Sequence, residues 1–246
     1  FVGCLDRSVI GVDEFEGQLL AQEIADHSHD DRVIRVSSSK KITNIGWSVF
    51  ANKGFLSEYR RGKQVASLDL RKCTALQGSH NHQNACAAYA AVRSLGLGPR
   101  SIEKALESFN GLSHRSQLVT EIGGVVFIND SKATNVDSAM KALATFSKVR
   151  WICGGEQKEE DISRLNNALT NVKKAYVIGA NTEKFSSQIS CEFENCNTMD
   201  IAVQKAFRDA QAGDTVLLAP AAASFDQYGS FEERGQAFEH EIKKLV

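Results

Sequence analysis

The sequence predicts an α/β protein whose first part is rich in β-strands and whose second part is a doubly wound, mainly parallel sheet. From Gly123 onward, short apolar runs alternate with stretches of helical periodicity. These runs show no alternation between apolar and polar residues, as expected for parallel strands that helices cover on both faces. Before about residue 75, alternating patterns and turn signals dominate instead.

The β-rich part is expected to hold its strands in two stretches. They are "DRVIRVSSS" (31–39) and "GWSVFANKGFLSEYRRGKQVASLDL" (46–70), and a turn signal lies at 52–54. We therefore expect residues 1–75 to form most of one sheet.

Two helices are predicted directly after these strands. Residues 78–98 are rich in alanine, and Gly96 or Gly98 is expected to end this first helix. Ser101 is expected to cap a short second helix over 101–109.

In the second part, four buried strands are expected, with helices between them and at the C-terminus. The strands are "GVVFI" (124–128), "VRWIC" (149–153), "KAYVIG" (174–179) and "TVLLA" (215–219). The helices are 135–147, about 160–171, 182–190, 198–211 and a last one whose apolar face is formed by Phe231, Phe238, Ile242 and Leu245. The two patterns meet at "FNGLSHR" (109–115), so we expect two domains, 1–110 and 111–246.

Polar loops follow the expected strands of the second part. They are "NDSKATN" (129–135), "GGEQKEED" (154–161), "GANTEK" (179–184) and "APAAASFDQYGSFEERG" (219–235). In a doubly wound sheet, ligands bind beyond the carboxyl ends of the strands. These loops are therefore expected to face one polar crevice.

The composition is that of an ordinary soluble globular protein. Hydrophobic residues make up 42% and charged residues 24% of 246, and the net charge is −1. This near-neutral charge favours neither nucleic acid nor an acidic membrane as a partner. No apolar run approaches the ~18 residues that span a bilayer, and no signal peptide opens the chain.

The six cysteines are scattered and contain no C-x-x-C pair. Cys191 and Cys196 lie closest together but have no histidine cluster beside them, so no zinc site is expected. Cys86 and Cys153 stand in apolar settings typical of buried thiols, and a reducing cytoplasm fits this usage best. The chain does not begin with methionine, and Phe1–Cys4 reads as a strand begun midway, which predicts a longer protein.

Each candidate side chain of the crevice also has an ordinary structural interpretation. Asp130 and Lys132 could lie in a solvated loop, with Thr134 or Asn135 capping the next helix. Lys158 could be a surface charge.

The remaining candidates allow similar alternatives. Ser224 could be a turn residue, although it follows a strand and small residues as an anion site would. His114 and Arg115 could belong to a surface ion pair, although arginine also matches phosphate oxygens. Asn81 and Asn84 could cap the alanine-rich helix, although amide edges also suit adenine.

Two nucleotide-binding motifs are excluded by pattern. "GLGPRS" (96–101) lacks the third glycine of a dinucleotide fingerprint and follows a helix, and no G-x-x-x-x-G-K-[ST] loop occurs. From the residues alone, the chain is an α/β protein with a polar crevice for an anionic ligand.

Five stretches, in their order and spacing, resemble the Mur ligase family. They are "GSHNHQNACAA", "FNGLSHRSQLV", "FINDSKATN", "CGGEQK" and "PAAASFDQYGSFEERGQAF". Within the family they are most similar to the member that adds D-glutamate. The resemblance implies that 1–110 is the latter part of the ATP-binding central domain and 111–246 the Rossmann-like C-terminal domain.

This resemblance implies ATP-driven amide synthesis in peptidoglycan assembly by a cytoplasmic monomer. The substrates would be UDP-N-acetylmuramoyl-L-alanine and D-glutamate, and the cofactors ATP and Mg²⁺. For ATP, the resemblance implies that Asn81 and Asn84 hold the adenine. It also implies that Arg115 contacts the phosphates and that Asp130 binds the ribose.

For D-glutamate, the resemblance implies Thr134 and Lys158 at the side-chain carboxylate and Ser224 and the backbone of Phe231 at the α-carboxylate, with Phe225 in the same set.

As catalytic residues, the resemblance implies His114, which would orient the incoming amine, and Lys132, which would act electrostatically.

The sequence also departs from the family pattern. The family's phosphate-binding glycine loop, its magnesium-binding Glu and His, its carbamylated Lys and its UDP-binding domain precede the matched part. We therefore expect the isolated chain to be an inactive fragment, because nothing in it cradles the β- and γ-phosphates with Mg²⁺. "PAAAS" also stands where the family usually has "PACAS", a small-for-small change.

Three rival hypotheses remain open. A sibling Mur ligase or a folylpolyglutamate synthetase-like enzyme is disfavoured by "NDSKATN". A half-ligase that binds nucleotide or amino acid without catalysis is a second rival. A dehydrogenase is the weakest, since no G-x-G-x-x-G follows a strand.

Overall fold

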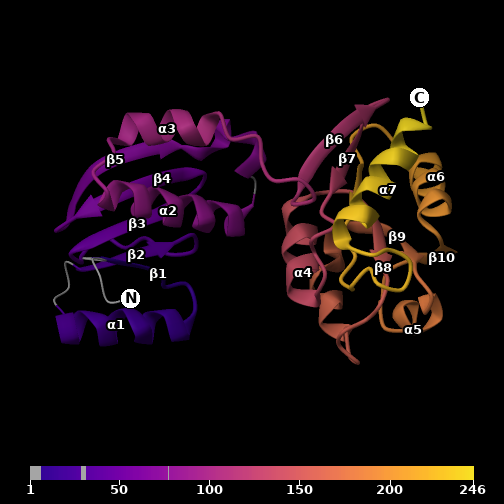
Figure 1. The fold of residues 1–246 in the computed structure, drawn as a ribbon, viewed down its shortest axis with the longest axis horizontal. Coiled ribbons are helices and arrows are strands. Elements are labelled where there is room, and N and C mark those ends of the chain that lie inside the picture. The colour runs from indigo at the N-terminus through magenta and orange to yellow at the C-terminus, as the bar shows by residue number, and fades with distance from the viewer. Residues whose placement is uncertain (1–6, 29–31, 77) are drawn as a thin grey trace. The chain divides into compact units, whose positions relative to one another are not determined.

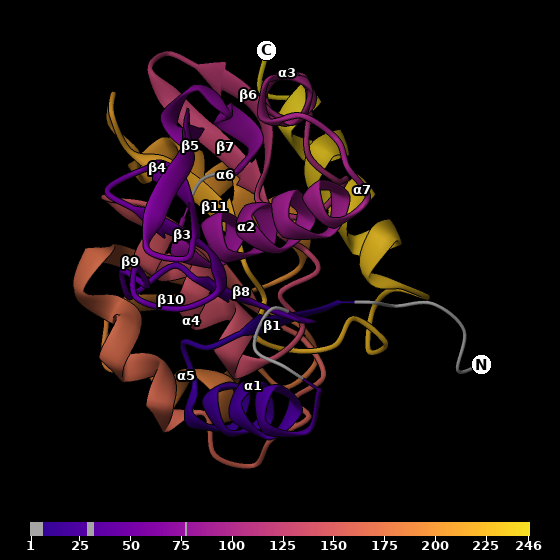
Figure 2. The same ribbon diagram turned by 90° about the vertical axis from the view of Figure 1, so that its left-hand side faces the viewer.

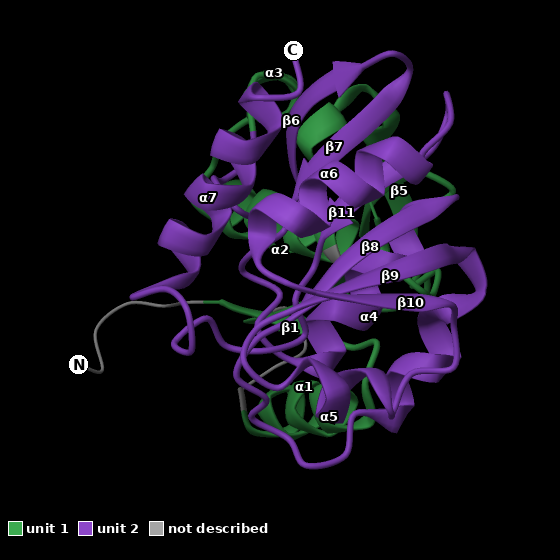
Figure 3. Ribbon diagram, turned by 90° about the vertical axis from the view of Figure 1, so that its right-hand side faces the viewer, with its two compact units in different colours: residues 1–110 green, residues 111–246 purple. Residues whose placement is uncertain are grey.

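The chain divides into two units, Phe1–Asn110 and Gly111–Val246 (Figure 3). The structure is a computed structural model and describes residues 7–28, 32–76 and 78–246. The strand expected at Phe1–Cys4 lies outside the described residues.

Unit 1 is built on a five-stranded sheet in the order β1-β2-β3-β4-β5. The strands are β1 (Ser8–Gly11), β2 (Val33–Ser37), β3 (Trp47–Asn52), β4 (Phe55–Arg60) and β5 (Lys63–Asp69). The pairs from β1 to β3 are parallel, and those from β3 to β5 are antiparallel. The two expected strand regions are confirmed, because β2 lies in the first and β3 to β5 fill the second.

The helices of unit 1 are α1 (Phe15–Ser28), α2 (Ser79–Ser94) and α3 (Pro99–Glu107), with short 3₁₀ turns at Leu70–Lys72 and Thr74–Leu76. The helix α2 packs on β1, β2 and β3, while α1 packs at the β1 end of the sheet (Figure 1 and Figure 2). The alanines of α2 allow this close approach, and Ala85 and Ala90 lie in the buried core.

Two predictions for unit 1 were wrong. The helix α1 lies in the part expected to be β-rich. The sequence pattern of α1 is only weakly amphipathic, so it gave no helix prediction. Phe15 and Leu19 are exposed, and only a few small or branched side chains pack inward. Ser101 does not cap α3, because the helix begins at Pro99 with Gly98 as its N-cap. A proline fixes φ for the first helical turn and needs no hydrogen-bond donor there.

Unit 2 is built on a six-stranded sheet in the order β10-β9-β8-β11-β7-β6. The strands are β6 (Gln117–Ile122), β7 (Val125–Asn129), β8 (Val149–Gly154), β9 (Val172–Ile178), β10 (Phe193–Asn197) and β11 (Thr215–Leu218). All pairs are parallel except β6 with β7. The four expected strands are confirmed as β7, β8, β9 and β11. The sequence patterns missed β6 and β10, the strands at the two edges, which carry fewer buried side chains.

Helices cover both faces of this sheet. One apolar core lies under α4 (Val136–Thr145), the 3₁₀ helix η4 (Ser163–Asn171) and α5 (Thr182–Ser186), and the other lies under α6 (Met199–Asp209) and α7 (Phe231–Lys243). The predicted doubly wound α/β architecture is therefore confirmed. The segment expected to be a helix over 160–171 is a 3₁₀ helix, and the one expected over 182–190 ends at Ser186.

The expected apolar face of α7 is only partly correct. Phe238 and Ile242 are buried in the core and Leu245 packs against it. Phe231, by contrast, is absent from that cluster and stacks with polar side chains at the start of the helix.

Candidate active site

Three loops at the carboxyl ends of the unit 2 strands are joined by backbone hydrogen bonds. These rim loops are 130–135 after β7, 155–162 after β8 and 219–230 after β11. Asp130 N donates to Leu218 O at 2.8 Å, and Ala221 N donates to Ala133 O at 2.9 Å. Glu156 pairs with Ala223 in an antiparallel bridge. The rim is therefore one connected structure, as expected from the strand order.

A buried arginine holds the rim loops to α7. Arg234 is 1% exposed, and its Nη1 donates to the carbonyls of Ala222 and Ala223 at 3.1 and 3.0 Å. Its Nε donates to Ser131 Oγ at 3.1 Å and its Nη2 to Ser131 O at 3.0 Å. Ser131 Oγ in turn donates to the carbonyl of Phe231 at 2.7 Å. One side chain thus links two rim loops with the first turn of α7.

The charge of Arg234 is satisfied by oxygens of neutral groups. Burial lowers its pKa to about 10, and nearby Asp226 and Tyr228 act in the opposite direction. The guanidinium therefore stays charged near neutral pH. Gly155 makes room for it, because a Cβ there would lie 2.3 Å from Ala223 O and 3.2 Å from Arg234 Nη1.

A second buried network surrounds His114. Asn129 Nδ2 lies 3.0 Å from His114 Nδ1, 3.1 Å from Gly235 O and 2.9 Å from Glu239 Oε1. Asn129 Oδ1 accepts from Ser131 N at 3.1 Å. Gly235 is required at this helix–ring contact, since its Cβ would lie 2.2 Å from His114 Nδ1.

The segment that carries His114 has an uncommon backbone. His114 has φ 62° and Ser116 has φ 44°, both in the left-handed region. Such residues cost about 1–3 kcal/mol each and need support from their surroundings. Gln117 Oε1 accepts from His114 N at 2.7 Å, and Asp130 Oδ1 accepts from Ser116 N at 3.2 Å. These bonds hold the expected site segment in a fixed conformation.

Asp130 lies at the junction of this segment with the rim. Burial raises the pKa of its carboxyl to about 6, although the Ser116 N–H and the charge of Arg115 lower it. Arg115 itself is exposed. The structure therefore brings Asp130, Arg115 and His114 into one neighbourhood of unit 2.

Lys132 and Phe231 form another contact of the rim. Lys132 Nζ lies 3.8 Å from the centroid of the Phe231 ring, and the His114 ring meets the same ring edge-on at 6.2 Å. Asn135, rather than Thr134, caps α4, since its side chain accepts from Ser138 N at 2.9 Å.

The other expected ligands of D-glutamate differ in exposure. Ser224 is 2% exposed on the loop after β11, while Phe225 is 68% exposed. Lys158 is exposed on the loop after β8. Beside it, the amide of Gln157 is buried, and neither its nitrogen nor its oxygen has a hydrogen-bond partner among the described residues.

The two asparagines expected to hold adenine lie in unit 1, in the first turns of α2. Asn84 is exposed and Asn81 is partly buried. Between them, Gln83 Nε2 donates to Asp13 Oδ2 at 2.8 Å. Burial raises the pKa of Asp13, but hydrogen bonds from Ser37 and its neighbours lower it to about 2. The start of α2 is thereby fixed to a carboxylate that stays ionised.

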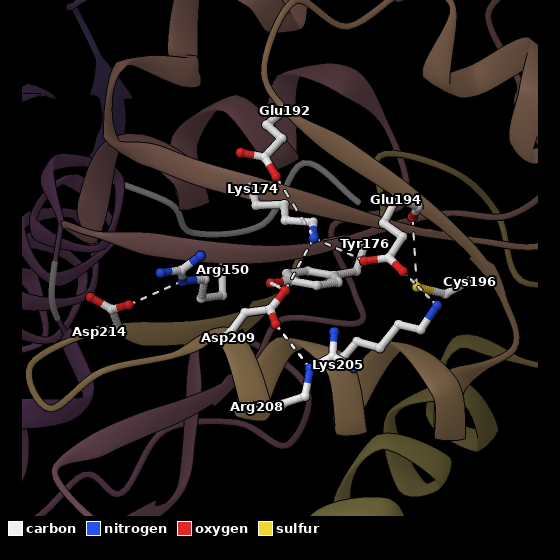
Figure 4. A network of polar contacts seen from close by, with 10 residues as sticks. All are labelled: Arg150, Lys174, Tyr176, Glu192, Glu194, Cys196, Lys205, Arg208, Asp209 and Asp214. Carbon is white, nitrogen blue, oxygen red and sulfur yellow. Dashed lines mark hydrogen bonds and ion pairs between the residues drawn. The ribbon is translucent and has the colours of Figure 1, made fainter.

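At the opposite, amino end of the unit 2 sheet, the charged side chains form ion pairs with one another (Figure 4). Lys174 Nζ lies 2.9 Å from Glu194 Oε2 and 3.1 Å from Asp209 Oδ2. Arg150 Nε lies 3.0 Å from Asp214 Oδ2. The hydrogen bond from Lys174 lowers the pKa of Glu194. Here each basic group faces a carboxylate.

The described residues contain neither a cluster of potential metal ligands nor a helix suited to a membrane. No group of three His, Cys, Asp or Glu side chains in residues 7–28, 32–76 and 78–246 is placed to hold a metal ion. In the same ranges, no helix combines the length and the apolar character needed to cross a bilayer.

Four residues of the site were missed by sequence reasoning: Asn129, Ser131, Arg234 and Glu239. Arg234 left a signal, because it stands four residues before Phe238 and eight before Ile242, on the buried face of its helix. A charged residue in an apolar stripe indicates a buried network. Asn129 ends β7 and Ser131 lies in the polar stretch that follows it, but no pattern in the sequence showed that both side chains turn inward.

Comparisons with known proteins agree with this fold. The family model for the glutamate ligase domain of Mur ligases matches residues 114–222. The UDP-N-acetylmuramoylalanine–D-glutamate ligase of Ruegeria pomeroyi is 60% identical over 241 residues, 98% of this chain and 52% of that relative. The ligase of the same name from Dinoroseobacter shibae is 54% identical over 246 residues, 100% of this chain and 53% of the relative.

Solved structures share the fold at low identity. FolC of E. coli in complex with DHPP and ADP has a TM-score of 0.64 at 22% identity, covering 98% of this chain and 55% of that one. The MurF ligase of Thermotoga maritima in complex with ADP has a TM-score of 0.58 at 17% identity, covering 98% and 63%.

The fold and the comparisons define the class of this protein as an α/β protein that contains a Mur ligase domain. Residues 114–222 match the glutamate ligase domain of Mur ligases, and nearly the whole chain is similar to ligases named for adding D-glutamate. The chain spans about half the length of the curated relatives that it matches.

Proposed function

We propose that this chain is part of an ATP-dependent ligase that joins D-glutamate to UDP-N-acetylmuramoyl-L-alanine in the cytoplasmic synthesis of peptidoglycan precursors. The observation that carries the proposal is the 60% identity, along 98% of the chain, to a relative named for that reaction. The rim supports it, because it gathers cationic and hydroxyl groups at the end of the sheet where ligands bind.

The chemistry explains why such groups are needed. A carboxylate does not condense with an ammonium in water, so ATP first phosphorylates the carboxylate of the acceptor. The amine of D-glutamate then attacks the acyl phosphate, and phosphate leaves through a tetrahedral intermediate. The protein must hold the amine close to the carbonyl carbon and stabilise the oxyanion.

In this proposal D-glutamate lies against the rim loops. Lys158 and Thr134 bind its side-chain carboxylate, and Ser224 binds the α-carboxylate beside Phe225. The carbonyl of Phe231 already accepts from Ser131, so its N–H, in the first turn of α7, is the group that meets the α-carboxylate. A dianionic amino acid thereby receives one cation and several donors.

The proposed nucleotide contacts are described for each unit by itself. In unit 2, one carboxylate oxygen of Asp130 accepts a hydrogen bond from Ser116 N, and the other would accept one from a ribose hydroxyl. Arg115 would contact phosphate oxygens. In unit 1, Asn81 and Asn84 hold the adenine. Mg²⁺ would accompany ATP and neutralise charge on its phosphates.

Titration of the chain with D-glutamate tests the proposal. We expect Lys158→Ala to weaken D-glutamate binding about 10- to 100-fold, since a charge-assisted hydrogen bond contributes about 1.5–3 kcal/mol. Lys173→Ala is the matched control, because this exposed lysine stands near the amino end of β9. Calorimetry with both variants measures the effect, and equal affinities would contradict the role of Lys158. In the whole ligase, the KM for D-glutamate should rise far more than that for ATP.

The same titration separates the rival functions. A sibling or folylpolyglutamate-type ligase would prefer L-glutamate or a diamino acid over D-glutamate. A binding module without catalysis would bind D-glutamate or ATP but form no ADP in any context. We expect the 246-residue chain alone, which we propose is monomeric, to form no D-glutamate-dependent ADP, since it holds no phosphate-binding glycine loop.

A further inference from the structure

The amide of Asn129 can take only one orientation in its buried network. Its Oδ1 faces the N–H of Ser131 at 3.1 Å, and its Nδ2 faces the carbonyl of Gly235 at 3.1 Å and Glu239 Oε1 at 2.9 Å. The reversed amide would place N–H against N–H at Ser131 and oxygen against oxygen at the other two groups. Such an arrangement loses the hydrogen bonds with Ser131, Gly235 and Glu239 and could gain only one, from His114 Nδ1, for a side chain that is 0% exposed.

This orientation determines where His114 carries its hydrogen. Nδ1 of the ring lies 3.0 Å from Asn129 Nδ2, which is a donor only. A hydrogen on Nδ1 would therefore point at another N–H group. The carboxylate oxygen Glu239 Oε1 lies 3.9 Å from Nδ1, beyond hydrogen-bond distance. The two hydrogens of Asn129 Nδ2 are shared among His114 Nδ1, Gly235 O and Glu239 Oε1, so the neutral ring is expected to leave Nδ1 as an acceptor and carry its hydrogen on Nε2.

The Nε2 atom of His114 is available to a ligand. Among the described residues no hydrogen bond involves it, and it is not one of the buried side-chain atoms that lack a partner. The edge-on contact with Phe231 and the close approach of Gly235 hold the ring plane in place. The ring therefore presents one fixed N–H donor.

We propose that Asn129 is a positioning residue that keeps His114 in its Nε2–H form, so that His114 donates a hydrogen bond to an anionic oxygen of the reactants. A donor at Nε2 suits a carboxylate or phosphoryl oxygen. It does not suit the nucleophile, because an amine held by a donor has its lone pair occupied. This changes the role that the family resemblance implies for His114, and the choice of ligand rests on the proposed function.

Two-bond ¹H–¹⁵N spectra of the ¹⁵N-histidine-labelled chain test the tautomer directly. The His114 signals are identified by their loss in His114→Gln. At a pH where the ring is neutral, we expect a single form with hydrogen on Nε2. His240, exposed on α7, should show shifts averaged between both tautomers. Hydrogen on Nδ1 of His114, or averaging like that of His240, would overturn the proposal.

Substitution of Asn129 separates positioning from simple packing. Asn129→Asp places an acceptor opposite Nδ1 and should move the hydrogen from Nε2 to Nδ1. If repulsion from Glu239 prevents folding, the double variant Asn129→Asp with Glu239→Gln removes the like charge and keeps the test. A folded variant in which the hydrogen stays on Nε2 would show that Asn129 only packs.

Addition of D-glutamate to the labelled wild-type chain tests the donor role. We expect the Nε2 signal of His114 to shift while its hydrogen is retained. Binding without a shift, or with loss of that hydrogen, would overturn the donor role. If D-glutamate does not bind at all, the proposed function fails, whereas the tautomer result still decides the role of Asn129.

Discussion

The two ends of the unit 2 sheet are both rich in charge, but they use it differently. At the amino end, Lys174 and Arg150 each face a carboxylate at about hydrogen-bond distance (Figure 4). At the carboxyl end, Lys132 lies on an aromatic ring, Lys158 is exposed, and Arg234 is buried against carbonyls and a hydroxyl.

The difference indicates a division of roles within one sheet. Paired charges neutralise each other and leave little field for a ligand, so the amino end contributes mainly to stability. Cations without carboxylate partners keep their attraction for an anion. Substitutions at the amino end should therefore change stability alone, and substitutions at the rim should also change binding.

The largest effect is expected for Arg234→Met. The variant loses four hydrogen bonds and leaves the carbonyls of Ser131, Ala222 and Ala223 without this donor. We expect a loss of about 3–5 kcal/mol in the free energy of unfolding, together with loss of D-glutamate binding. Denaturant unfolding and calorimetry measure both. Arg208→Met, at a side chain that is 66% exposed, is the control and should change stability by about 0.5 kcal/mol or less.

The next effect is expected at the amino end, for Asp214→Asn. Arg150, whose side chain is 16% exposed, would lose its carboxylate partner. We expect a loss of about 2 kcal/mol in the free energy of unfolding, because an ion pair that is largely buried is broken from one side. Affinity for D-glutamate should stay at the wild-type value. A parallel loss of affinity would show that the two ends are coupled and would break the comparison.

A smaller effect concerns pH and Asp130. Burial raises its folded pKa to about 6 from an ordinary value of 3.8, so its contribution to stability is fully present below pH 3.8 and is lost as pH rises through 6. Wild type should therefore lose about 1–2 kcal/mol more than Asp130→Asn between pH 4 and 7, after allowance for partial exposure. Unfolding curves of both proteins across this range measure the difference. Parallel pH profiles would show that Asp130 ionises normally.

The smallest effect is expected at Gln157. Its amide is buried without a hydrogen-bond partner among the described residues, which costs stability. Gln157→Met keeps the volume and removes the polar group, so we expect a gain of about 1 kcal/mol in thermal or denaturant unfolding. A loss of stability instead would mean that the amide has a partner in solution, such as a bound water.

The sequence predicted the doubly wound sheet because its four central strands are continuous apolar runs that leave little ambiguity. It did not predict α1, whose exposed Phe15 and Leu19 lie off any single buried stripe, or the edge strand β10, which is short and polar. The crevice was predicted from polar loops that follow strands. The inward orientation of Asn129 and Arg234 was not, because it depends on contacts across 100 or more residues.

The hydrogen bonds of Arg234 determine which positions of the loop after β11 can tolerate amino-acid substitution. Three of its four acceptors are main-chain carbonyls, which are present whatever side chain stands at those positions. The link between the loops is therefore insensitive to the identity of Ala222 or Ala223, provided that the side chains stay small. A randomised library over these positions should tolerate many small residues with little loss of stability, whereas position 234 should accept arginine alone. The molecule thereby separates the residue that holds its loops in place from the residues that are free to vary.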